Sequence, residues 1–501
     1  MERTPALERS IVAIMLAVVA VIYANGYLTN SAVPGNNPAY PLGWWGWFDQ
    51  SMYLRATQAF SRFDMDPAKH WYPPGFALLG APFVRSMPGH AFFFPGLACI
   101  VAAFLGFLSF AKRFGVSRLW AAALFMVPLL DRRLLDAWVV PWSSTPTAAL
   151  QWVLLALVAA HVMADRLMVW RTVLMGVLAG LVIAFRPTDI ISAAVALGCA
   201  ALFDIIHRRP RLAGPLAMLA GGTAVLATYA ALYLRIYGWH VSGYLTTSLK
   251  LGFYYDTLGY KAYTLLIDPR AWFGIDPDHW HEGLFQRAPW LVFGLAGILA
   301  AWFCVAPRLR WLLAALVGAI VLSTANYLAY IDLLATGIWR YGNVHYLKWA
   351  YPGMALLGFL VLRELAVGRR KLAASALAAA FLLCCLRVAP RLAADGEPYR
   401  MALLAGPKAN WTQAYFELPL LHDALGPLPT VEASRAFPLT NGLRVHSIRR
   451  DFTGPLGWAE GDGLGAITAQ THYRSVVEFG WPCFIFPRRC PSGTVTSPVG
   501  N

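Results

Sequence analysis

The sequence predicts an all-α polytopic membrane protein followed by a small mixed α/β domain. The number of long apolar runs predicts about eleven transmembrane helices. Two observations lead to this prediction. Of the 501 residues, 58% are hydrophobic and only 13% are charged, whereas a soluble domain carries about 25% charged residues. The hydrophobic residues also gather in runs of about 17–25 residues, the length that crosses a bilayer as a helix. Because lipid offers no partner to exposed backbone groups, such runs fold as helices.

The apolar runs are the candidate transmembrane helices. They cover residues 10–28, 90–110, 118–131, 144–163, 171–186, 189–206, 213–235, 288–306, 311–330, 346–366 and 371–388. The first run is too long for the apolar core of a signal peptide, and no A-x-A cleavage site follows it, so we expect a retained helix. Together with their connections, these runs form a predicted membrane domain over residues 1–388.

Basic residues gather in the short connections and predict the orientation. The clusters lie at residues 3–9, 111–118, 165–171, 207–211, 307–310 and 368–371. When the spans are followed in order, all these clusters fall on one side, which the positive-inside rule assigns to the cytoplasm. The pair Arg132 and Arg133 is the exception among the basic clusters, because it falls on the other side. We therefore expect a protein of the inner (plasma) membrane with a cytoplasmic N-terminus. The net charge of +15 reflects these connections, and no nucleic-acid recognition module accompanies it.

The long segments fall on the outer, non-cytoplasmic side, which is the periplasm in a bacterium. They are residues 29–89, 131–143, 236–287, 331–345 and the tail 389–501. The tail contains short strand-like stretches within residues 431–448 and 473–490, which predicts a small α/β extracytoplasmic domain. Cys483 and Cys490 have a spacing that permits a disulfide on this oxidising side. We expect the functional site on the outer side, because most of the residues outside the membrane lie there.

The first outer segment contains "GWWGWFDQ" (43–50), in which three tryptophans surround the single carboxylate Asp49. Asp49 is either a loop acid among interfacial tryptophans or a general base whose pKa is tuned by partial burial. The following residues 50–63, which include Arg55, have the pattern of an amphipathic helix lying on the membrane. In "YPPG" (72–75), Tyr72 precedes two prolines that predict the start of a helix at re-entry.

Two further outer positions carry charges beside predicted helix ends. "DRRLLDAWVVPWSSTP" (131–146) contains Asp131 and Asp136, and its serines and threonine (143–145) are suited to cap the next helix. In "AFRPTD" (184–189), Arg186 stands at the outer edge of a span. An arginine at this depth either reaches out to water or pairs with an acid or an anionic ligand, for which its forked guanidinium is suited.

Two outer clusters complete the set of candidate sites. Asp276, Asp278, His279, His281 and Glu282 have metal-ligand chemistry, but a polar loop without a second group of ligands is the alternative interpretation, so no metal ligand is assigned and a divalent metal stays an open alternative. "GIWRYGNVHYLKWAYPG" (337–353) brings basic and aromatic residues to the start of a span, at headgroup depth, where they suit an anionic lipid head. Its candidates are Arg340, His345 and Lys348.

In this order, these features resemble the GT-C class of membrane glycosyltransferases, similar to the protein mannosyltransferase and aminoarabinose transferase superfamily. The resemblance consists of an acid in the first outer segment (Asp49), "YPPG" at re-entry, an acid in the second outer segment, "GVLAGLVIAFRP" (176–187) and an aromatic "HYLKWAYPG" (345–353). It covers most of the membrane domain, and an outer C-terminal domain also fits the class.

The resemblance implies transfer of a monosaccharide from a polyprenyl-phosphate donor to a glycan, lipid or protein acceptor at the outer face of the bilayer. Asp49 matches the first-segment acid that acts as catalytic base or positions the acceptor, and Asp136, or alternatively Asp131, is the candidate for the second acid. The candidate substrate-binding residues are Arg55, Tyr72, Arg186, Arg340, His345 and Lys348. The alternatives are a ligase or polymerase acting on lipid-linked glycans, a transporter, and a membrane protein without catalytic activity; a transporter is expected to have paired charges deep in the membrane.

Overall fold

The structure is a computed structural model of the chain. It describes residues 5–30, 33, 35–36, 48–208, 210–251, 253, 258, 262–267, 283–330, 333, 338–366, 371, 375, 401–403, 436–438, 444–446 and 475–477. The chain divides into two units, each taken by itself below. The first consists of Met1–Tyr244, Trp290–Thr324 and Val344–Ala380, and the second of Leu245–Pro289, Ala325–Asn343 and Phe381–Asn501.

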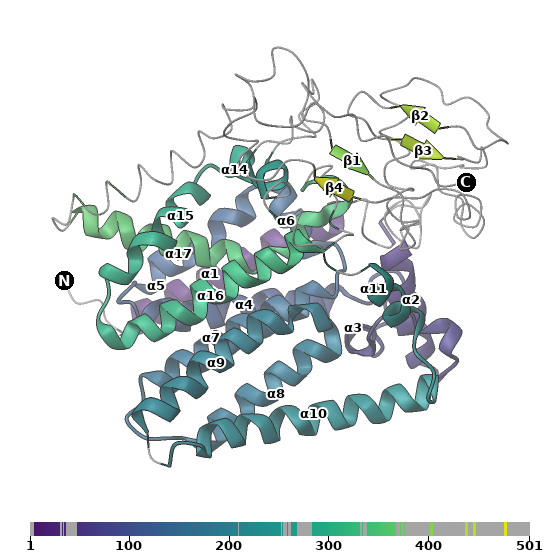
Figure 1. Ribbon diagram of the computed structural model, residues 1–501, viewed down its shortest axis with the longest axis horizontal. Helices are drawn as coiled ribbons and strands as arrows, with labels where there is room; N and C mark the ends of the chain where they lie inside the picture. The colour runs from purple at the N-terminus through teal and green to yellow at the C-terminus, as the bar shows by residue number, and fades with distance from the viewer. Residues whose placement is uncertain are drawn as a thin grey trace. The chain divides into compact units, whose positions relative to one another are not determined.

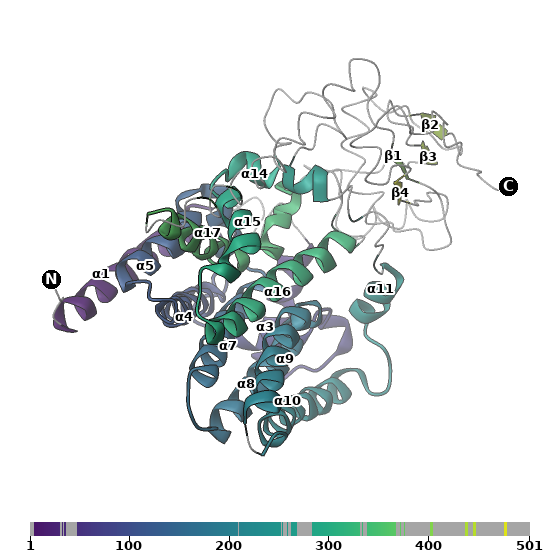
Figure 2. The same ribbon diagram turned by 60° about the vertical axis from the view of Figure 1, so that its left-hand side comes forward.

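The first unit is a bundle of helices (Figures 1 and 2). These are α1 (Pro5–Thr29), α2 (Phe48–Phe60), α3 (Pro74–Gly80), α4 (Phe93–Lys112), α5 (Arg118–Met126), α6 (Arg132–Val139), α7 (Ser144–Val162), α8 (Val169–Phe185), α9 (Ile190–His207), α10 (Ala213–Tyr237), α15 (Leu291–Ala300), α16 (Pro307–Ala329) and α17 (Ala350–Ala366). The short turns η2 (Pro67–Lys69), η3 (Val127–Leu130), η4 (Pro187–Asp189), η7 (Ala301–Phe303) and η8 (Arg340–Tyr346) lie between them. A helix lies at each predicted span except 371–388, which falls outside the described residues but for Lys371 and Ser375.

Six of the described helices are long and apolar enough to cross a membrane, and they are α1, α4, α7, α9 with its preceding turn, α10 and α16. The helical segments Arg118–Leu130, Val169–Phe185 and Leu291–Phe303 are apolar but shorter. These helices make the chain a multi-pass membrane protein. The larger number of spans expected from the sequence stays a prediction.

Prolines set several helix boundaries, as the sequence indicates. Helix α3 begins at Pro74, and α16 begins at Pro307, because proline suits the first turn of a helix, where its missing N–H is not needed. Helix α8 ends at Phe185 because Pro187 forces the preceding Arg186 into an extended conformation, with φ −157° and ψ 98°. Arg186 is therefore fixed where the helix stops.

Small residues allow the helices to approach closely, as is common in membranes. A Cβ atom added at Gly176 of α8 would lie 1.8 Å from the carbonyl oxygen of Met218 in α10, and one added at Gly221 would lie 2.1 Å from that of Val173. Helix α7 lies inside the bundle, with 72% of its span buried, whereas α10 is peripheral, with 17% buried. The polar residues of α7 must therefore find partners within the protein.

The C-terminal end of α7, which we name the arginine end (Ala160–Ala164), is covered by three arginines. Arg171 comes from the start of α8, Arg208 follows α9, and Arg308 lies in the first turn of α16. Their guanidinium groups donate to carbonyl oxygens of Ala160 (Arg171, 3.2 Å), His161 (Arg208, 2.6 Å), Val162 (Arg308, 2.9 Å) and Ala164 (Arg208, 2.8 Å; Arg308, 3.0 Å). The carbonyls that a helix leaves unpaired at its C-terminus are thus satisfied.

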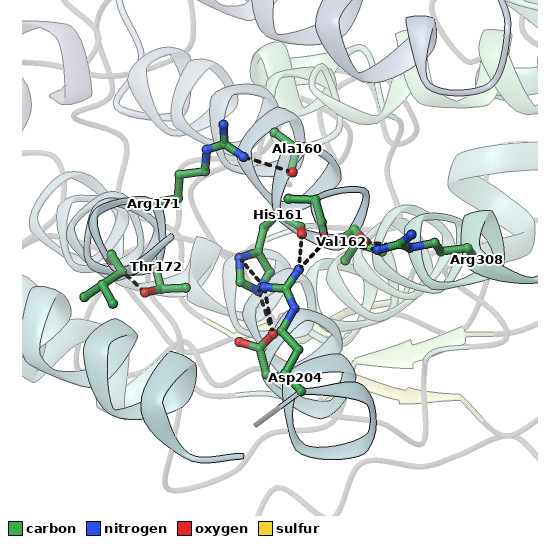
Figure 3. Close-up of polar contacts among 10 residues, drawn as sticks. Ala160, His161, Val162, Arg171, Thr172, Asp204 and Arg308 are labelled. Carbon is green, nitrogen blue, oxygen red and sulfur yellow. Dashed lines mark hydrogen bonds and ion pairs between the residues drawn. The ribbon is translucent and has the colours of Figure 1, made fainter. Parts of the chain in front are cut away.

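A buried ion pair completes the arginine end (Figure 3). His161 Nε2 lies 2.8 Å from Asp204 Oδ1, and both side chains are 1% exposed. Arg208 Nη1 lies 3.3 Å from the same oxygen. Asp204 on α9 is thereby joined to α7 and to the connection that follows α9.

At the opposite end of α7, helices α2 and α3 pack on the end of α8 through a buried cluster that includes Tyr53, Leu54, Phe76 and Phe185. The sequence predicts α2 as a helix lying on the membrane with its polar side in water. The structure differs, because the polar residues Gln50, Ser51 and Thr57 are buried as well. Helix α2 is therefore covered by protein on most of its surface, which fixes the position of Asp49 in its first turn.

The second unit contains α11 (Gly243–Leu251), the π-helical turn η6 (Tyr263–Ile267) and α14 (Leu284–Arg287). Its strands form two antiparallel pairs, β1 (Met401–Leu403) with β4 (Ser475–Val477) and β2 (Ala436–Pro438) with β3 (Arg444–His446). Strands β2, β3 and β4 lie in stretches of the tail that the sequence marks as strand-like. The remainder of 389–501, including Cys483 and Cys490, lies outside the described residues, so the predicted C-terminal domain stays a prediction.

Candidate active site

Asp49 accepts a hydrogen bond from a tyrosine and lies where a helix favours negative charge. It is half-buried in the first turn of α2, where the N-terminal end of the helix dipole stabilises a carboxylate. The Tyr72 hydroxyl donates a hydrogen bond to Asp49 Oδ1. Burial raises the pKa of Tyr72, and the charge of Asp49 raises it further, so the hydroxyl stays protonated and remains a donor. The surrounding tryptophans at 44, 45 and 47 lie outside the described residues.

Tyr53 connects Asp49 with the start of α7. Its ring centroid lies 4.6 Å from that of Tyr72, and its hydroxyl donates to Ser143 Oγ at 3.0 Å. Burial raises the pKa of Tyr53, the charge of Asp49 raises it further, and the charge of Arg186 lowers it. Tyr53 therefore lies within electrostatic range of both the carboxylate and the guanidinium.

Arg186 is held by contacts on several sides. Its Nε lies 3.9 Å from Asp189 Oδ1, and its guanidinium carbon lies 4.4 Å from the centroid of the Tyr346 ring. Its Nη1 lies 3.5 Å from Nδ1 of His345. The sequence offers Arg186 either an acidic partner or an anionic ligand, and the structure supplies the acid in Asp189, three residues along the chain.

His345 has a defined tautomer. Its ring stacks on Trp142, with centroids 4.1 Å apart and planes 9° apart, and Ser144 Oγ lies 2.8 Å from Nδ1. Burial lowers the pKa of His345, and the charges of Arg186 and Lys348 lower it further, so the ring is neutral near pH 7. Because a guanidinium can only donate, we assign Nδ1 as the acceptor for both Ser144 and Arg186, which leaves the proton on Nε2.

The first residues of α7, which we name the site end (Ser143–Thr147), differ from the sequence prediction. The serines were expected to cap the helix, but Ser143 has helical φ and ψ of −59° and −19°, and its hydroxyl makes no capping bond. An N-cap residue normally has an extended backbone. The hydroxyls bond distant segments instead, with the pairs Ser143–Tyr53, Ser144–His345, Thr145–Lys348 and Thr147–Asp189.

Lys348 is buried, and its side chain has two hydrogen-bond acceptors within the protein. Its Nζ donates to the carbonyl oxygen of Ala137 at 2.7 Å and to Thr145 Oγ1 at 2.6 Å, and it lies 5.3 Å from the centroid of the Trp138 ring. These contacts join the entry of α17 to α6 and to the site end. The ammonium group is therefore placed to hold the helices together, whereas the sequence suggests a ligand for an anionic lipid head.

Asp131 and Asp136 are positioned by α6. Asp131 caps this helix by accepting from the backbone N–H groups of Arg133 and Leu134, at 2.9 and 3.2 Å. Asp136 accepts from Asn30 Nδ2 at 2.7 Å and lies 3.7 Å from Nε of Arg132. Burial raises the pKa of Asp136, although Arg132 opposes this change. Asp131 is thus tied to the start of α6, and Asp136 to α6 and to Asn30 after α1, whereas Asp49 lies in α2 and Arg186 follows α8.

The other predicted site residues are only partly placed. Arg55 lies on the exposed side of α2, and the backbone of Arg340 starts η8, while its side chain lies outside the described residues. The cluster at 276–282 also lies outside them. Within the part of the chain that the structure describes, there is no group of three or more His, Cys, Asp or Glu that could hold a metal.

Several site residues were missed by the sequence analysis. They are Tyr53, Trp142, Ser143, Ser144, Thr147 and Asp189. Two of them follow a helical spacing that was available in the sequence, because Tyr53 lies four residues after Asp49 and Asp189 lies three residues after Arg186. The serines carried only a local capping signal, and their real partners are about 90 and 201 residues away along the chain.

No family model matches this chain, and no curated protein matches it. Among solved structures, it is similar to ArnT from Cupriavidus metallidurans in the apo state, with 15% identity, a TM-score of 0.43 and coverage of 81% of this chain and 67% of that chain. It is also similar to the Archaeoglobus fulgidus oligosaccharyltransferase in the apo form, with 14% identity, a TM-score of 0.39 and coverage of 76% and 55%.

The chain thus spans little more than half the length of that oligosaccharyltransferase. The archaeal oligosaccharyltransferase AglB from Archaeoglobus fulgidus, in complex with an inhibitory peptide and a dolichol-phosphate, is similar at 16% identity and a TM-score of 0.36, with coverage of 74% and 54%. At TM-scores below 0.5, function has to be argued from the residues of the site. The structural neighbours, an aminoarabinose transferase and an oligosaccharyltransferase, are both glycosyltransferases of the GT-C class that the sequence resembles.

Proposed function

We propose that this protein is an integral membrane glycosyltransferase that moves a monosaccharide from a polyprenyl-phosphate donor to a hydroxyl group of an envelope glycan, lipid or protein. The observation that carries the proposal is a series of contacts that connects a carboxylate with a guanidinium. Tyr72 donates to Asp49, and its ring lies 4.6 Å from that of Tyr53. Tyr53 donates to Ser143, and the neighbouring Ser144 bonds the His345 nitrogen that Arg186 also contacts. Glycosyl transfer needs these two groups, a base for the acceptor and a cation for the departing phosphate.

Asp49 is the proposed general base. In the transfer step, an acceptor hydroxyl oxygen forms a bond to the anomeric carbon of the donor while its proton passes to a carboxylate oxygen of Asp49. Tyr72 donates a hydrogen bond to Oδ1 of Asp49. The role of Tyr72 in this mechanism is to orient the carboxylate.

Arg186 and His345 are proposed to receive the leaving group. The bond between the anomeric carbon and the phosphate oxygen breaks, and its electron pair stays on the phosphate, whose charge the guanidinium stabilises. His345 accepts at Nδ1 from Ser144 and Arg186, so its Nε2–H is the group available to donate to a phosphate oxygen. A neutral donor beside a cation adds a hydrogen bond without repelling the arginine.

The proposed orientation places the N-terminus in the cytoplasm and the site at the outer face. Support comes from how residues distribute between the ends of α7. Asp49, Arg186 and His345 come from connections that the basic clusters predict to be outside, and they meet at the site end. Arg171, Arg208 and Arg308 come from connections predicted to be inside, and they meet at the arginine end. A lipid-borne donor reaches the site end without crossing the bilayer.

The test is a mass comparison of cell-envelope glycans and glycolipids from strains that carry the wild type, a deletion, Asp49→Asn or the control Asp64→Asn. Asp64 belongs to the same outer segment but pairs with Lys69 at the surface. We expect a species lighter by one sugar in the deletion and in Asp49→Asn, with Asp64→Asn unchanged, since loss of a general base costs about 10²–10⁴-fold in rate.

Other results would redirect the proposal. A defect in the deletion that Asp49→Asn does not share removes Asp49 from the role of base. Loss of whole chains of repeating units would favour a ligase or polymerase of lipid-linked glycans. An unchanged envelope in the deletion, under conditions in which the gene is expressed, would favour the transporter or non-catalytic alternatives.

A further inference from the structure

Helix α2 ends in an unusual way. Phe63 is the non-glycine residue with a positive φ, 56°, in the part of the chain that the structure describes. The N–H of Phe63 bonds the carbonyl of Phe60 at 3.0 Å, and the N–H of Asp64 bonds that of Ala59 at 2.9 Å. This is the Schellman pattern, in which the residue at the position of Phe63 adopts the left-handed conformation and is usually glycine. A phenylalanine here strains the backbone where glycine would not.

Burial of the side chain does not offset this strain, because Phe63 is 86% exposed. The loop after it is fixed by other contacts. Asp64 Oδ1 accepts from the N–H of Asp66 at 3.0 Å, Lys69 Nζ lies 2.5 Å from Asp64 Oδ2, and His70 Nε2 lies 2.8 Å from the carbonyl oxygen of Asp64. The loop therefore presents Phe63 outward in a defined position, where its exposed ring can meet a partner outside the described part of the chain.

The residues around Phe63 indicate which environment its ring contacts. The end of α2 packs on the last turn of α10 in a cluster of Ala56, Phe60, Ala77 and Ile236, and the Tyr237 hydroxyl donates to the carbonyl of His70. Helix α10 is a candidate membrane span that ends at Tyr237. Its exposed leucines are Leu216, Leu219, Leu226 and Leu234. Phe63 thus lies at the level where a lipid-facing helix leaves the bilayer.

A second aromatic and two arginines flank the same level. Trp239, two residues after the end of α10, is 92% exposed. Arg62 beside Phe63 is exposed, and the exposed Arg85 donates through Nη2 to the carbonyl of Ser61 at 3.0 Å. Aromatic rings at the boundary of the hydrocarbon and arginines at the level of phosphate groups are the composition of a membrane–water interface.

We propose that Phe63 and Trp239 form a lipid anchor, which inserts into the phospholipid leaflet at the site end of α7. The partner is the bilayer surface itself, with apolar chains around the two rings and phosphate groups near Arg62 and Arg85. The anchor fixes the depth of the C-terminal end of α2, and α2 carries Asp49 at its other end. The proposal concerns membrane contact and does not depend on the reaction that the site performs.

The test measures by spin labelling how deep the two aromatic positions lie in the bilayer. The protein is placed in nanodiscs of phosphatidylethanolamine and phosphatidylglycerol at a ratio of roughly 3:1, which gives an anionic bilayer of bacterial type. A nitroxide is attached to Phe63→Cys, Trp239→Cys or the control Lys69→Cys in a background without the native cysteines. Lys69 is exposed on the same loop and pairs with acids. We expect collisions with oxygen to exceed collisions with a water-soluble nickel chelate at 63 and 239, and the reverse at 69.

Two outcomes overturn the proposal. A label at 63 that meets the nickel chelate as often as the label at 69 places the ring in water. A label at 63 that is protected from both reagents places it under protein. If the cysteine variants do not fold, Phe63→Gly and Phe63→Ala provide the second measurement. Glycine suits the left-handed backbone, so Phe63→Gly should melt higher than Phe63→Ala in detergent. Phe63→Ala keeps a side chain on the strained backbone, so relative to wild type it should lose more stability in nanodiscs than in detergent. Equal losses of Phe63→Ala in nanodiscs and in detergent would also overturn the anchor.

Discussion

The two ends of helix α7 use polar residues in opposite ways. At the arginine end, three guanidinium groups donate to main-chain carbonyls, and a histidine and an aspartate that are both 1% exposed bond each other. At the site end, hydroxyls that were expected to bond their own helix reach other segments, and the cation Arg186 lies beside a neutral histidine and a tyrosine ring. The first arrangement closes a helix terminus, whereas the second brings four segments to one point.

The difference shows that one end of α7 contributes mainly to the stability of the fold, whereas the other end positions the groups of the candidate site. Backbone carbonyls at a helix end are obligatory acceptors, so arginines there contribute mainly to folding. Side-chain hydroxyls have both donor and acceptor capacity, so they can set the tautomer of His345 and hold tyrosines in place. Substitutions at the arginine end should therefore change stability with little effect on substrate binding. Substitutions at the site end should change substrate binding with less effect on stability.

The largest effect is expected for Asp204→Ala at the arginine end. Removal of Asp204 takes the carboxylate away from His161 and Arg208, while Arg208 keeps its bonds to backbone carbonyls. Breaking a buried pair costs about 3–5 kcal/mol of unfolding free energy. Thermal denaturation in detergent measures this loss, and the KM of any folded fraction should match wild type. The control Asp165→Ala removes an exposed partner of Arg308 and should change the stability by less than about 1 kcal/mol. Equal losses in the two variants would contradict the comparison.

A smaller effect is expected for Arg186→Gln at the site end. Glutamine keeps a donor for Asp189 but removes the charge proposed to stabilise the phosphate, so the KM for a polyprenyl-phosphate sugar should rise about tenfold, or about 1.4 kcal/mol. Arg171→Gln, which removes a donor to Ala160, is the matched control and should leave KM unchanged. If Arg186→Gln lowers the melting temperature without altering KM, the guanidinium serves only the Asp189 pair.

A third expected effect is a dependence on pH. Burial lowers the pKa of His345 well below its ordinary 6.5, so below that pH the unfolded chain binds a proton that the folded chain does not. Stability from the neutral ring is complete above pH 6.5 and is lost as pH falls toward the folded pKa, by up to about 1.4 kcal/mol per pH unit. Denaturation of wild type and His345→Gln between pH 5 and 8 (about the range in which histidine titrates) measures it. Identical slopes would show that His345 does not titrate on unfolding.

The sequence predicts local features of this molecule well. Long apolar runs and prolines mark the helices, because the bilayer and the missing N–H group act on each segment separately. The same reasoning places Arg186 at the end of α8 and Asp49 near the start of α2. The sequence places the short helix α6 in a loop, although Asp131 stands where a capping residue is expected and does cap the helix.

The site itself depends on pairings that no local pattern contains. Ser144 and His345 are 201 positions apart, and Tyr53 and Ser143 are 90 apart. A serine that precedes an apolar run predicts a cap, and only the packing of α2 and η8 against α7 turns it toward another partner. Lys348 illustrates the same limit, because its position at headgroup depth suggested an anionic ligand, whereas its buried contacts are with Ala137 and Thr145.

The close approach of α8 to α10 has a consequence for the lipid that surrounds the protein. Because backbone oxygens lie where Cβ atoms of Gly176 and Gly221 would stand, neither helix can slide along the other without a steric clash. Helix α10 faces lipid along most of its length, and Arg186 stands at the end of α8. A bilayer of different hydrophobic thickness tilts or displaces α10, and α8 must follow. We therefore expect the length of the surrounding acyl chains to influence the position of Arg186.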